Sequence, residues 1–243
     1  MTVQFRARHG LIVALDAETV DACKRTIDLT TPVQGVVGYK LGMTTVLRLG
    51  LAETVRQMRA HTDLPLLYDH QKAGPDVFDM AAKFAKLCAE AKVDGLILFP
   101  TAGTRAVQGF VGETIKHGML PIVGGDLPFP DYNVSGGGYI ADDALERIFK
   151  TSLEVGCAHF IVPGNATDKL RYHAHWISAE MNARGKDTVF VVPGIGPLGG
   201  KLDELVKAAP GCSVIGVVGR AVYDAPDPRA AAMALADQAL AAA

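Results

Sequence analysis

The stretch that decides the fold is GVVGYKLGMTTVLRLGLAETVRQMRAHTDLPLLYD (35–69). It begins and ends with short apolar runs, and residues 44–61 between them carry apolar side chains at helical spacing. Near-continuous apolar runs are typical of parallel strands covered on both faces, and parallel strands are joined by a helical crossover. Residues 35–69 therefore predict a strand–helix–strand unit.

The same alternation continues in both directions along the chain. Apolar runs that predict buried strands occur at 11–16, 35–42, 64–69, 94–100, 119–126, 158–164, 188–194 and 213–219. Segments with helical spacing follow them at 17–29, 44–61, 76–92, 103–118, 142–156, 166–185, 201–210 and 228–243. Eight such units fill all 243 residues, so we expect an α/β protein with one (β/α)8 TIM-barrel domain over 1–243. An open doubly wound sheet is the alternative.

Composition argues against several classes of protein, among them nucleic-acid-binding and membrane proteins. The chain has 24 Lys and Arg against 26 Asp and Glu, a net charge of −2, which argues against a nucleic-acid-binding surface. No apolar stretch approaches the length of a membrane span, and the first residues lack the pattern of a secretory signal. The four cysteines are far apart, which indicates neither a zinc site nor a disulfide framework. We expect a cytoplasmic protein whose partner is a small molecule.

One connection is too long for a simple turn. Residues 126–140, DLPFPDYNVSGGGYI, follow the fifth predicted strand and contain two prolines and three consecutive glycines. Long loops at this end of a barrel strand serve as lids or substrate clamps. A lid-like loop is the functional interpretation, and a surface insertion without a role is the alternative.

Charged residues gather where the first three strands end. A charge that ends a buried strand needs a partner, so opposite charges from neighbouring strands should meet. Lys40 is the most informative, because it stands inside an apolar run. We expect one network of carboxylates and ammonium groups at the mouth of the barrel. Its candidates are Asp16, Lys40 and Asp69, with His70, Gln71, Lys72 and Asp76 just beyond.

The last two loops have the features of a phosphate site. The sequences PGIGPLGG (193–200) and VVGRAVY (217–223) offer glycine-rich backbone after strands seven and eight. Backbone N–H groups and a following short helix favour an anion there, and Arg220 adds a fixed cation. Ordinary turn glycines beside a surface arginine are the alternative.

The remaining histidines carry less information. His173 and His175 lie two residues apart, on different sides of a helix, and make a poor metal pair, while His159 more simply packs beside a strand. His70 suits either acid–base chemistry or the orientation of a neighbour. The sequence has no Ser–His–Asp order, P-loop or dinucleotide-binding glycine motif, so nucleotide hydrolysis and dinucleotide redox chemistry lack support.

Several of these motifs together resemble orotidine 5'-phosphate decarboxylase. They are ALD (14–16), YKLG (39–42), the Asp/Lys/Asp cluster in DHQKAGPD (69–76), PGIGPLGG (193–200) and VVGRAVYDAPDP (217–228). The resemblance covers nearly the whole chain in the right order. It implies a homodimeric barrel that removes CO2 from orotidine 5'-phosphate to give UMP, in pyrimidine biosynthesis, with neither metal nor organic cofactor.

The resemblance also implies roles for individual residues. Asp16 and Lys40 would contact the ribose, and Lys40 would belong to the catalytic charge network as well. Asp69 would face the carboxylate of the substrate, and Lys72 would deliver the proton to C6. Asp76 would reach across the dimer interface into the site of the partner. The remaining substrate contacts would be Ser135 to the pyrimidine, and Gly194, Ile195, Gly219 and Arg220 to the phosphate.

Two departures from the family pattern point to a divergent branch. The family has Asp-x-Lys-x-x-Asp, whereas DHQKAGPD is one residue longer in each gap, so the end of the third strand must bulge or turn early near Gly74 and Pro75. Leu198 stands where many members carry a glutamine that grips the phosphate.

Other functions stay open at this point. The related sugar-phosphate branch, with 3-keto-gulonate-phosphate decarboxylases and hexulose-phosphate synthases, uses Mg²⁺ and carries an acidic residue where this chain has Lys40. A sugar-phosphate isomerase barrel of the tryptophan or histidine pathways does not fit the Asp/Lys/Asp cluster. A non-catalytic nucleotide-binding barrel is the third alternative, if the altered spacing has broken the catalytic geometry.

Overall fold

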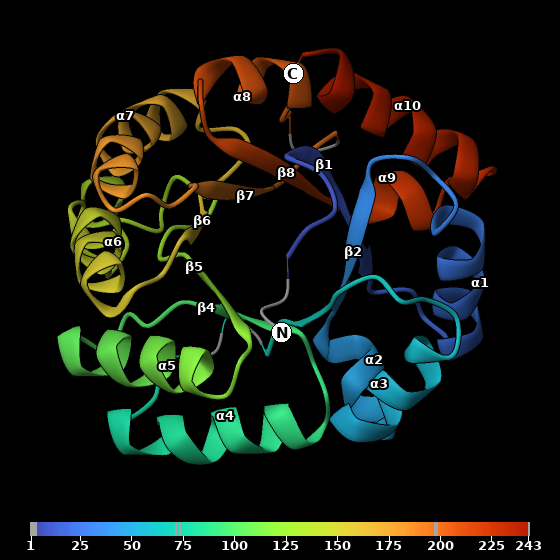
Figure 1. Ribbon diagram of the computed structural model, residues 1–243, viewed down its shortest axis with the longest axis horizontal. Helices are drawn as coiled ribbons and strands as arrows, with labels where there is room; N and C mark the ends of the chain where they lie inside the picture. The colour runs from blue at the N-terminus through green and yellow to red at the C-terminus, as the bar shows by residue number, and fades with distance from the viewer. Residues whose placement is uncertain (1–3, 71, 73, 197–198, 243) are drawn as a thin grey trace.

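Eight parallel strands close into a barrel with sequential order in the computed structural model, which describes residues 4–70, 72, 74–196 and 199–242 (Figure 1). This confirms the predicted TIM barrel and excludes the open sheet. All eight predicted strands are present, each within or near its apolar run. They are β1 (His9–Leu15), β2 (Val36–Leu41), β3 (Leu66–Tyr68), β4 (Gly95–Leu98), β5 (Leu120–Val123), β6 (His159–Ile161), β7 (Val189–Pro193) and β8 (Ser213–Val218).

Helices surround the barrel, as Figure 1 shows. They are α1 (Val20–Thr30), α2 (Met43–Leu49), α3 (Leu51–Arg59), α4 (Ala81–Glu90), α5 (Thr104–Lys116), α6 (Ala144–Val155), α7 (Thr167–Ala183), α8 (Leu202–Ala208), α9 (Arg220–Tyr223) and α10 (Pro228–Ala241). Two short 3-10 turns, η1 (Phe78–Met80) and η2 (Val134–Gly136), accompany them.

Two predicted helices differ in the structure. The segment 44–61 is not one helix but two, because Gly50 takes a φ of 74° between α2 and α3 and turns the chain there. The segment predicted as a helix from residue 76 becomes α-helical only at Ala81. Pro75 and Asp76 belong instead to the turn that follows β3, and this turn also positions part of the site.

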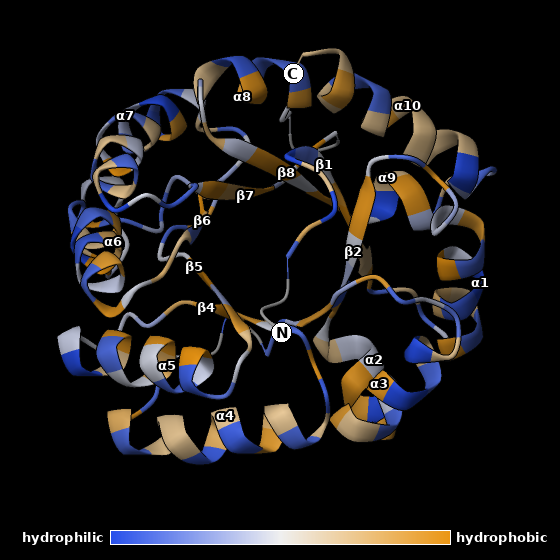
Figure 2. Ribbon diagram, viewed as in Figure 1, coloured by the Kyte–Doolittle hydropathy of each residue, from blue (hydrophilic) through white to orange (hydrophobic). Residues whose placement is uncertain are grey.

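The barrel interior is filled by apolar side chains, one from each strand. Branched residues dominate this layer, as is usual for TIM barrels. It consists of Ile12, Val37, Leu67, Ile97, Ile122, Ile161, Val191 and Ile215, with Phe99 just beyond β4. A second and larger core lies between the strands and the apolar faces of the helices, whose outer faces are polar (Figure 2).

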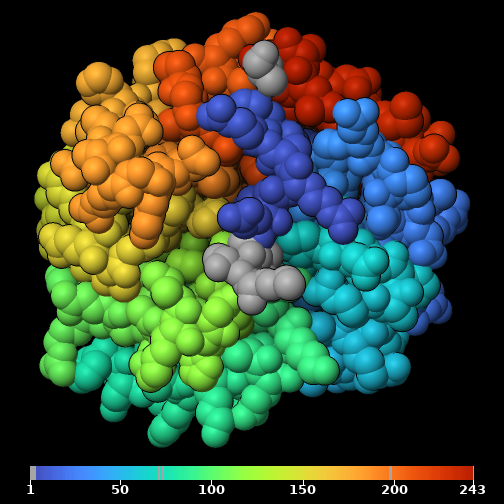
Figure 3. All heavy atoms as spheres, in the orientation of Figure 1, coloured from blue at the N-terminus to red at the C-terminus, as the bar shows by residue number. Residues whose placement is uncertain are grey.

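The amino-terminal segment crosses the end of the barrel at which the strands begin. Figure 3 shows this face, with the first described residues lying over its centre. Phe5 and Ala7 pack against the interior layer, and the Phe5 ring meets the His159 ring edge-on at 6.0 Å between centroids. The polar residues predicted to carry chemistry lie at the opposite end. Within the described ranges, no helix is long and apolar enough to cross a membrane.

Candidate active site

The ends of the first three strands bring three predicted residues into one cluster. Lys40 Nζ lies 2.8 Å from Asp16 Oδ2 and 3.8 Å from Asp69 Oδ2. The side chains of Lys40 and Asp69 are only 13% and 8% exposed. A buried ammonium is costly alone, so the two carboxylates explain why a lysine stands within the apolar strand β2.

Strand register and one glycine place these groups. Lys40 is paired with Ala14 of β1, two residues before Asp16, and with Leu67 of β3, two residues before Asp69. Both acids therefore lie two residues beyond the level of Lys40, where its long side chain reaches their carboxylates. A Cβ atom on Gly42 would lie 1.8 Å from Asp16 Oδ1, so the carboxylate occupies space that any other residue at position 42 would fill.

A tight turn after β3 brings Lys72 to the same cluster. Asp69 Oδ1 accepts a hydrogen bond from the backbone N–H of Lys72 at 2.9 Å, and Lys72 Nζ lies 3.4 Å from Asp69 Oδ2. Lys72 adopts a φ of 63°, which is unfavourable for a residue with a side chain and marks a constrained position. This geometry confirms the expected early turn, and the longer spacing of DHQKAGPD still makes Asp69 and Lys72 converge.

The turn is fastened to the next strand. The Lys72 carbonyl oxygen accepts from the Phe99 N–H at 3.2 Å, and Lys72 Nζ lies 5.2 Å from the centroid of the Phe99 ring. Gly74 has a φ of 123°, and a Cβ atom there would lie 2.9 Å from Pro100 Cα. Only glycine satisfies both conditions, so Gly74 sets how closely the turn packs.

His70 faces away from this cluster. Its Nδ1 is hydrogen-bonded to the hydroxyl of Tyr68, and its ring lies 5.8 Å from the Phe84 ring of α4. Burial raises the pKa of Tyr68 to about 12, so the phenol stays protonated. Of the two roles that the sequence left open, this position fits the orientation of a neighbour, since His70 holds the turn to α4.

A cavity of about 320 Å³ opens beside the cluster. The charged network forms one wall, and Gly194 and Gly219, after β7 and β8, form part of another. Ile195 is buried in the core, and Arg220 begins α9 with an exposed side chain, so neither lines the cavity. Leu198 and Gln71 lie outside the described residues. The rest of the lining is mostly apolar: Ala14, Ile97, Phe99, Leu127, Pro128, Phe129, Ile161, Pro163, Pro193 and Val217.

One acidic residue of the cavity, Asp126, was not predicted from the sequence. Asp126 follows β5, is 4% exposed, lines the cavity and forms an ion pair with Lys169 of α7. The signal was present, because MLPIVGGD (119–126) ends in an aspartate after an apolar run, as LIVALD (11–16) does. Because Asp126 is also the first residue of the long loop 126–140, its place at the end of a strand was less evident.

Two other predicted contacts lie away from the cavity of their own chain. Ser135 is exposed within η2 and donates a hydrogen bond to the carboxylate of Asp142. Leu127, Pro128 and Phe129 are the part of the loop that lines the cavity. Asp76 is exposed, and its Oδ1 accepts from the Val77 N–H at 2.7 Å.

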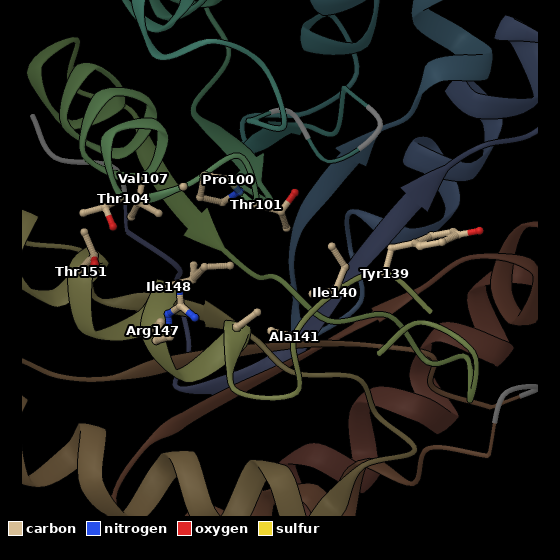
Figure 4. A pocket seen from close by; sticks show the side chains of 12 residues that line it. Pro100, Thr101, Thr104, Val107, Tyr139, Ile140, Ala141, Arg147, Ile148 and Thr151 are labelled. Carbon is tan, nitrogen blue, oxygen red and sulfur yellow. The ribbon is translucent and has the colours of Figure 1, made fainter. Parts of the chain in front are cut away.

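A second hollow, of about 210 Å³, lies between this loop, α5 and α6 (Figure 4). Its lining includes Thr104, Ile148 and Thr151, and Arg147 is the one charged side chain among its described lining residues. Tyr139 points away from the other labelled side chains in Figure 4. No carboxylate lines this hollow in the part of the chain described, whereas Asp16, Asp69 and Asp126 line the cavity beside the charged cluster. Nor do three or more His, Cys, Asp or Glu side chains gather as a metal site among the described residues.

Known proteins resemble this chain over most of its length. Residues 9–235 match the model of the orotidine 5'-phosphate decarboxylase / HUMPS family. Orotidine 5'-phosphate decarboxylase of Pyrococcus abyssi is 25% identical over 231 residues, covering 94% of this chain and 98% of the relative. The enzyme of Methanosarcina mazei is 24% identical and covers 94% of each chain.

Solved structures show the same barrel. Orotidine 5'-monophosphate decarboxylase from Methanocaldococcus jannaschii, complexed with the inhibitor BMP, superposes with a TM-score of 0.79 at 19% identity and covers 95% of this chain and 98% of that one. The Pyrococcus horikoshii enzyme gives a TM-score of 0.74 at 24% identity, with 94% and 98% covered. The likeness of the structures shows the shared fold, and the match over residues 9–235 shows that this chain belongs to the orotidine 5'-phosphate decarboxylase / HUMPS family.

Proposed function

We propose that this chain decarboxylates orotidine 5'-phosphate to UMP, without a metal ion, and that Lys72 protonates C6. The observation that carries the proposal is the Asp69 carboxylate, held between Lys40 at 3.8 Å and Lys72 at 3.4 Å on the wall of a cavity. The relatives named above carry this activity in their names. The cation Lys40 at β2 also opposes the alternative of a magnesium-dependent sugar-phosphate enzyme, because it would repel the metal.

Decarboxylation creates a negative charge on C6, so the positive charge that stabilises it must be in place before the reaction begins. When the C6–carboxylate bond breaks, CO2 leaves and the electron pair stays in an sp2 orbital on C6. Lys72 stabilises this negative charge and then transfers a proton from Nζ to C6. Asp69 orients the ammonium, since it binds both the backbone N–H and Nζ of Lys72. The apolar walls keep water away, which strengthens these interactions.

The phosphate belongs at the opposite side of the cavity. Strands β7 and β8 lie across the barrel from β3, and Gly194 and Gly219 line the cavity there. Arg220 follows as the first residue of α9 and is the cation nearest in sequence to these glycines. In this proposal Asp16 and Lys40, between the two ends, contact the ribose.

A homodimer would complete the site with Asp76. This residue is exposed, and the apolar side chains of Val77 and Phe78 beside it are exposed too. Exposed apolar side chains that lie together, as these two do, mark a candidate interface with another chain. We therefore propose that Asp76 enters the site of a second copy. Mixing inactive Lys72→Ala with inactive Asp76→Ala should then restore activity at about a quarter of the sites, and no recovery in mixed dimers would contradict the sharing.

The first test is the loss of orotidine 5'-phosphate absorbance with purified protein in EDTA. We expect rapid loss with the wild type and at least about a thousandfold less with Lys72→Ala. Lys86→Ala, which removes an exposed lysine of α4, is the matched control and should keep full activity. Activity only on a keto-pentulose phosphate with Mg²⁺ would place the chain in the sugar-phosphate branch. UMP binding without turnover would leave a nucleotide-binding barrel.

A further inference from the structure

The polar groups of the cavity are unevenly distributed. Among its described lining residues, the charged side chains of β1, β2 and the turn after β3 form one connected network. Across the cavity, the wall from β4 to β6 is apolar apart from a single charged side chain, Asp126. Asp126 is therefore the one charged side chain on this wall that could bind polar atoms on the side of a ligand facing away from the charged network.

One oxygen of Asp126 is left without a partner. The carboxylate forms its ion pair with Lys169 through Oδ2. Oδ1 is shielded from solvent and has no hydrogen-bond partner within the described residues. A buried acceptor of this kind costs free energy until a donor reaches it, and such groups often mark sites where a ligand supplies the missing bond.

We propose that Asp126 Oδ1 accepts a hydrogen bond from N3–H of the pyrimidine and so selects a uracil-type base. This inference rests on the proposed function. An ionised carboxylate can only accept hydrogen bonds. Once N1 of the pyrimidinedione carries the ribose, N3–H is its one ring donor, and O2 and O4 are acceptors. The chemistry of the two groups therefore permits only one pairing.

The placement of the ring agrees with this pairing. N3 lies across the six-membered ring from C6. With C6 at Lys72 beside β3, N3 is directed away from Lys72, and Asp126 is the one charged side chain among the described lining residues outside the charged network. A base with an unprotonated N3, such as cytosine, would present a lone pair to the carboxylate and be repelled.

Lys169 has a positioning role. Its ammonium neutralises Asp126, which would otherwise repel an anionic nucleotide, and it occupies Oδ2 so that Oδ1 is the free acceptor. Lys169 itself does not line the cavity. Its loss should weaken all phosphorylated ligands alike, whereas loss of Asp126 should change the choice of base.

The test compares UMP, CMP and ribose 5-phosphate by calorimetry with the wild type, Asp126→Ala and the isosteric Asp126→Asn. We expect the wild type to prefer UMP over CMP by at least about tenfold, and Asp126→Ala to reduce the ratio to within about threefold. Asp126→Asn can donate to N3 of cytosine and should bind CMP more tightly than the wild type does. Ribose 5-phosphate should bind the wild type and Asp126→Ala within about twofold of each other, because it has no base.

Controls separate this inference from the proposed function. Asp131→Asn, an exposed acid of the same loop, should leave the UMP to CMP ratio unchanged. An unchanged ratio in folded Asp126→Ala and Asp126→Asn that still bind UMP would overturn the role of Asp126 alone. A wild type that neither binds UMP nor consumes orotidine 5'-phosphate would overturn the proposed function and this inference together.

Discussion

The two walls of the cavity differ in chemical character. The β1–β3 wall buries charges and holds each with a partner, so that Lys40 and Asp69 contact two charged groups apiece. The β4–β6 wall offers mainly apolar surface, from residues such as Ile97, Phe99 and Ile161. The apolar wall lowers the local dielectric, and the charged wall acts in that environment. In the proposed mechanism reactivity therefore needs both walls, and each wall can be tested by itself.

Removing the central cation of the charged wall should have the largest effect. Lys40→Met leaves Asp16 and Asp69 facing each other with one lysine fewer, and we expect the free energy of unfolding to fall by about 3 kcal/mol. Denaturant titration measures this loss. Lys24→Met is the matched control, because Lys24 pairs with Asp21 on the surface, where ion pairs contribute about 0–1 kcal/mol. Equal losses in the two variants would contradict the buried network.

Shifting a carboxylate of that wall should have the next largest effect. In Gly42→Ala the new Cβ would stand 1.8 Å from Asp16 Oδ1, so the carboxylate must leave Lys40. We expect kcat/KM for orotidine 5'-phosphate to fall by about 30-fold, equivalent to about 2 kcal/mol. Gly112→Ala, on α5, adds a Cβ that makes only an ordinary contact at 3.7 Å with Val155 Cγ1 of α6, so this variant should keep full activity and gain stability. An unchanged kcat/KM in Gly42→Ala would show that the position of Asp16 is not critical.

The charged residues at the ends of β1 to β3 were largely predictable, and the shape of the turn after β3 was not. Asp16, Lys40 and Asp69 end successive strands, and in parallel strands that alone places them at one edge. An early turn carrying Lys72 was predicted, but its backbone conformation was not. Its form depends on contacts between residues distant in sequence, such as Gly74 against Pro100. Only the fold reveals contacts of this type.

The fold itself followed from local pattern, because each strand is an apolar run and each crossover has helical spacing. The break at Gly50 was visible as a glycine, yet a glycine inside a helical pattern does not by itself show that the chain turns there. Loop residues were the least predictable. Ser135 was placed at the pyrimidine by resemblance, but in the structure its partner is Asp142, a pairing that no motif encodes.

Replacing an aromatic side chain of the apolar wall should have a smaller effect. Its effects on stability and on kcat can be measured separately. Phe99→Leu keeps the wall apolar but removes the ring that faces Lys72 Nζ. We expect about 1 kcal/mol less stability and a severalfold lower kcat, because the ammonium is held less firmly. Phe110→Leu, in a buried position on α5 outside the cavity, should lose similar stability with kcat unchanged. Equal kcat values for the two variants would show that Phe99 only fills space.

The smallest expected effect is on the free energy of unfolding at acidic pH. It arises in the helices that pack behind the apolar wall. His173 of α7 is buried against the Phe149 ring, and its Nδ1 accepts a hydrogen bond from Trp176 Nε1 at 3.2 Å. Burial lowers the pKa of His173 to about 4, against about 6.5 in the unfolded chain. Above pH 6.5 neither state binds this proton. Between pH 6.5 and 4 only the unfolded state binds it, so stability falls as the pH falls through this window.

His173→Gln tests that slope, since the amide oxygen can still accept from Trp176 but cannot titrate. Between pH 8 and pH 5 the wild type should lose about 1–2 kcal/mol more unfolding free energy than the variant does. The pH dependence of the unfolding free energy that remains in the variant should include a contribution from His159, because burial also lowers the pKa of His159 to about 4. Denaturant titrations at the two pH values measure the difference. If both proteins lose the same free energy, His173 does not stay neutral in the folded state, and the acid sensitivity of this half of the barrel must come from other groups.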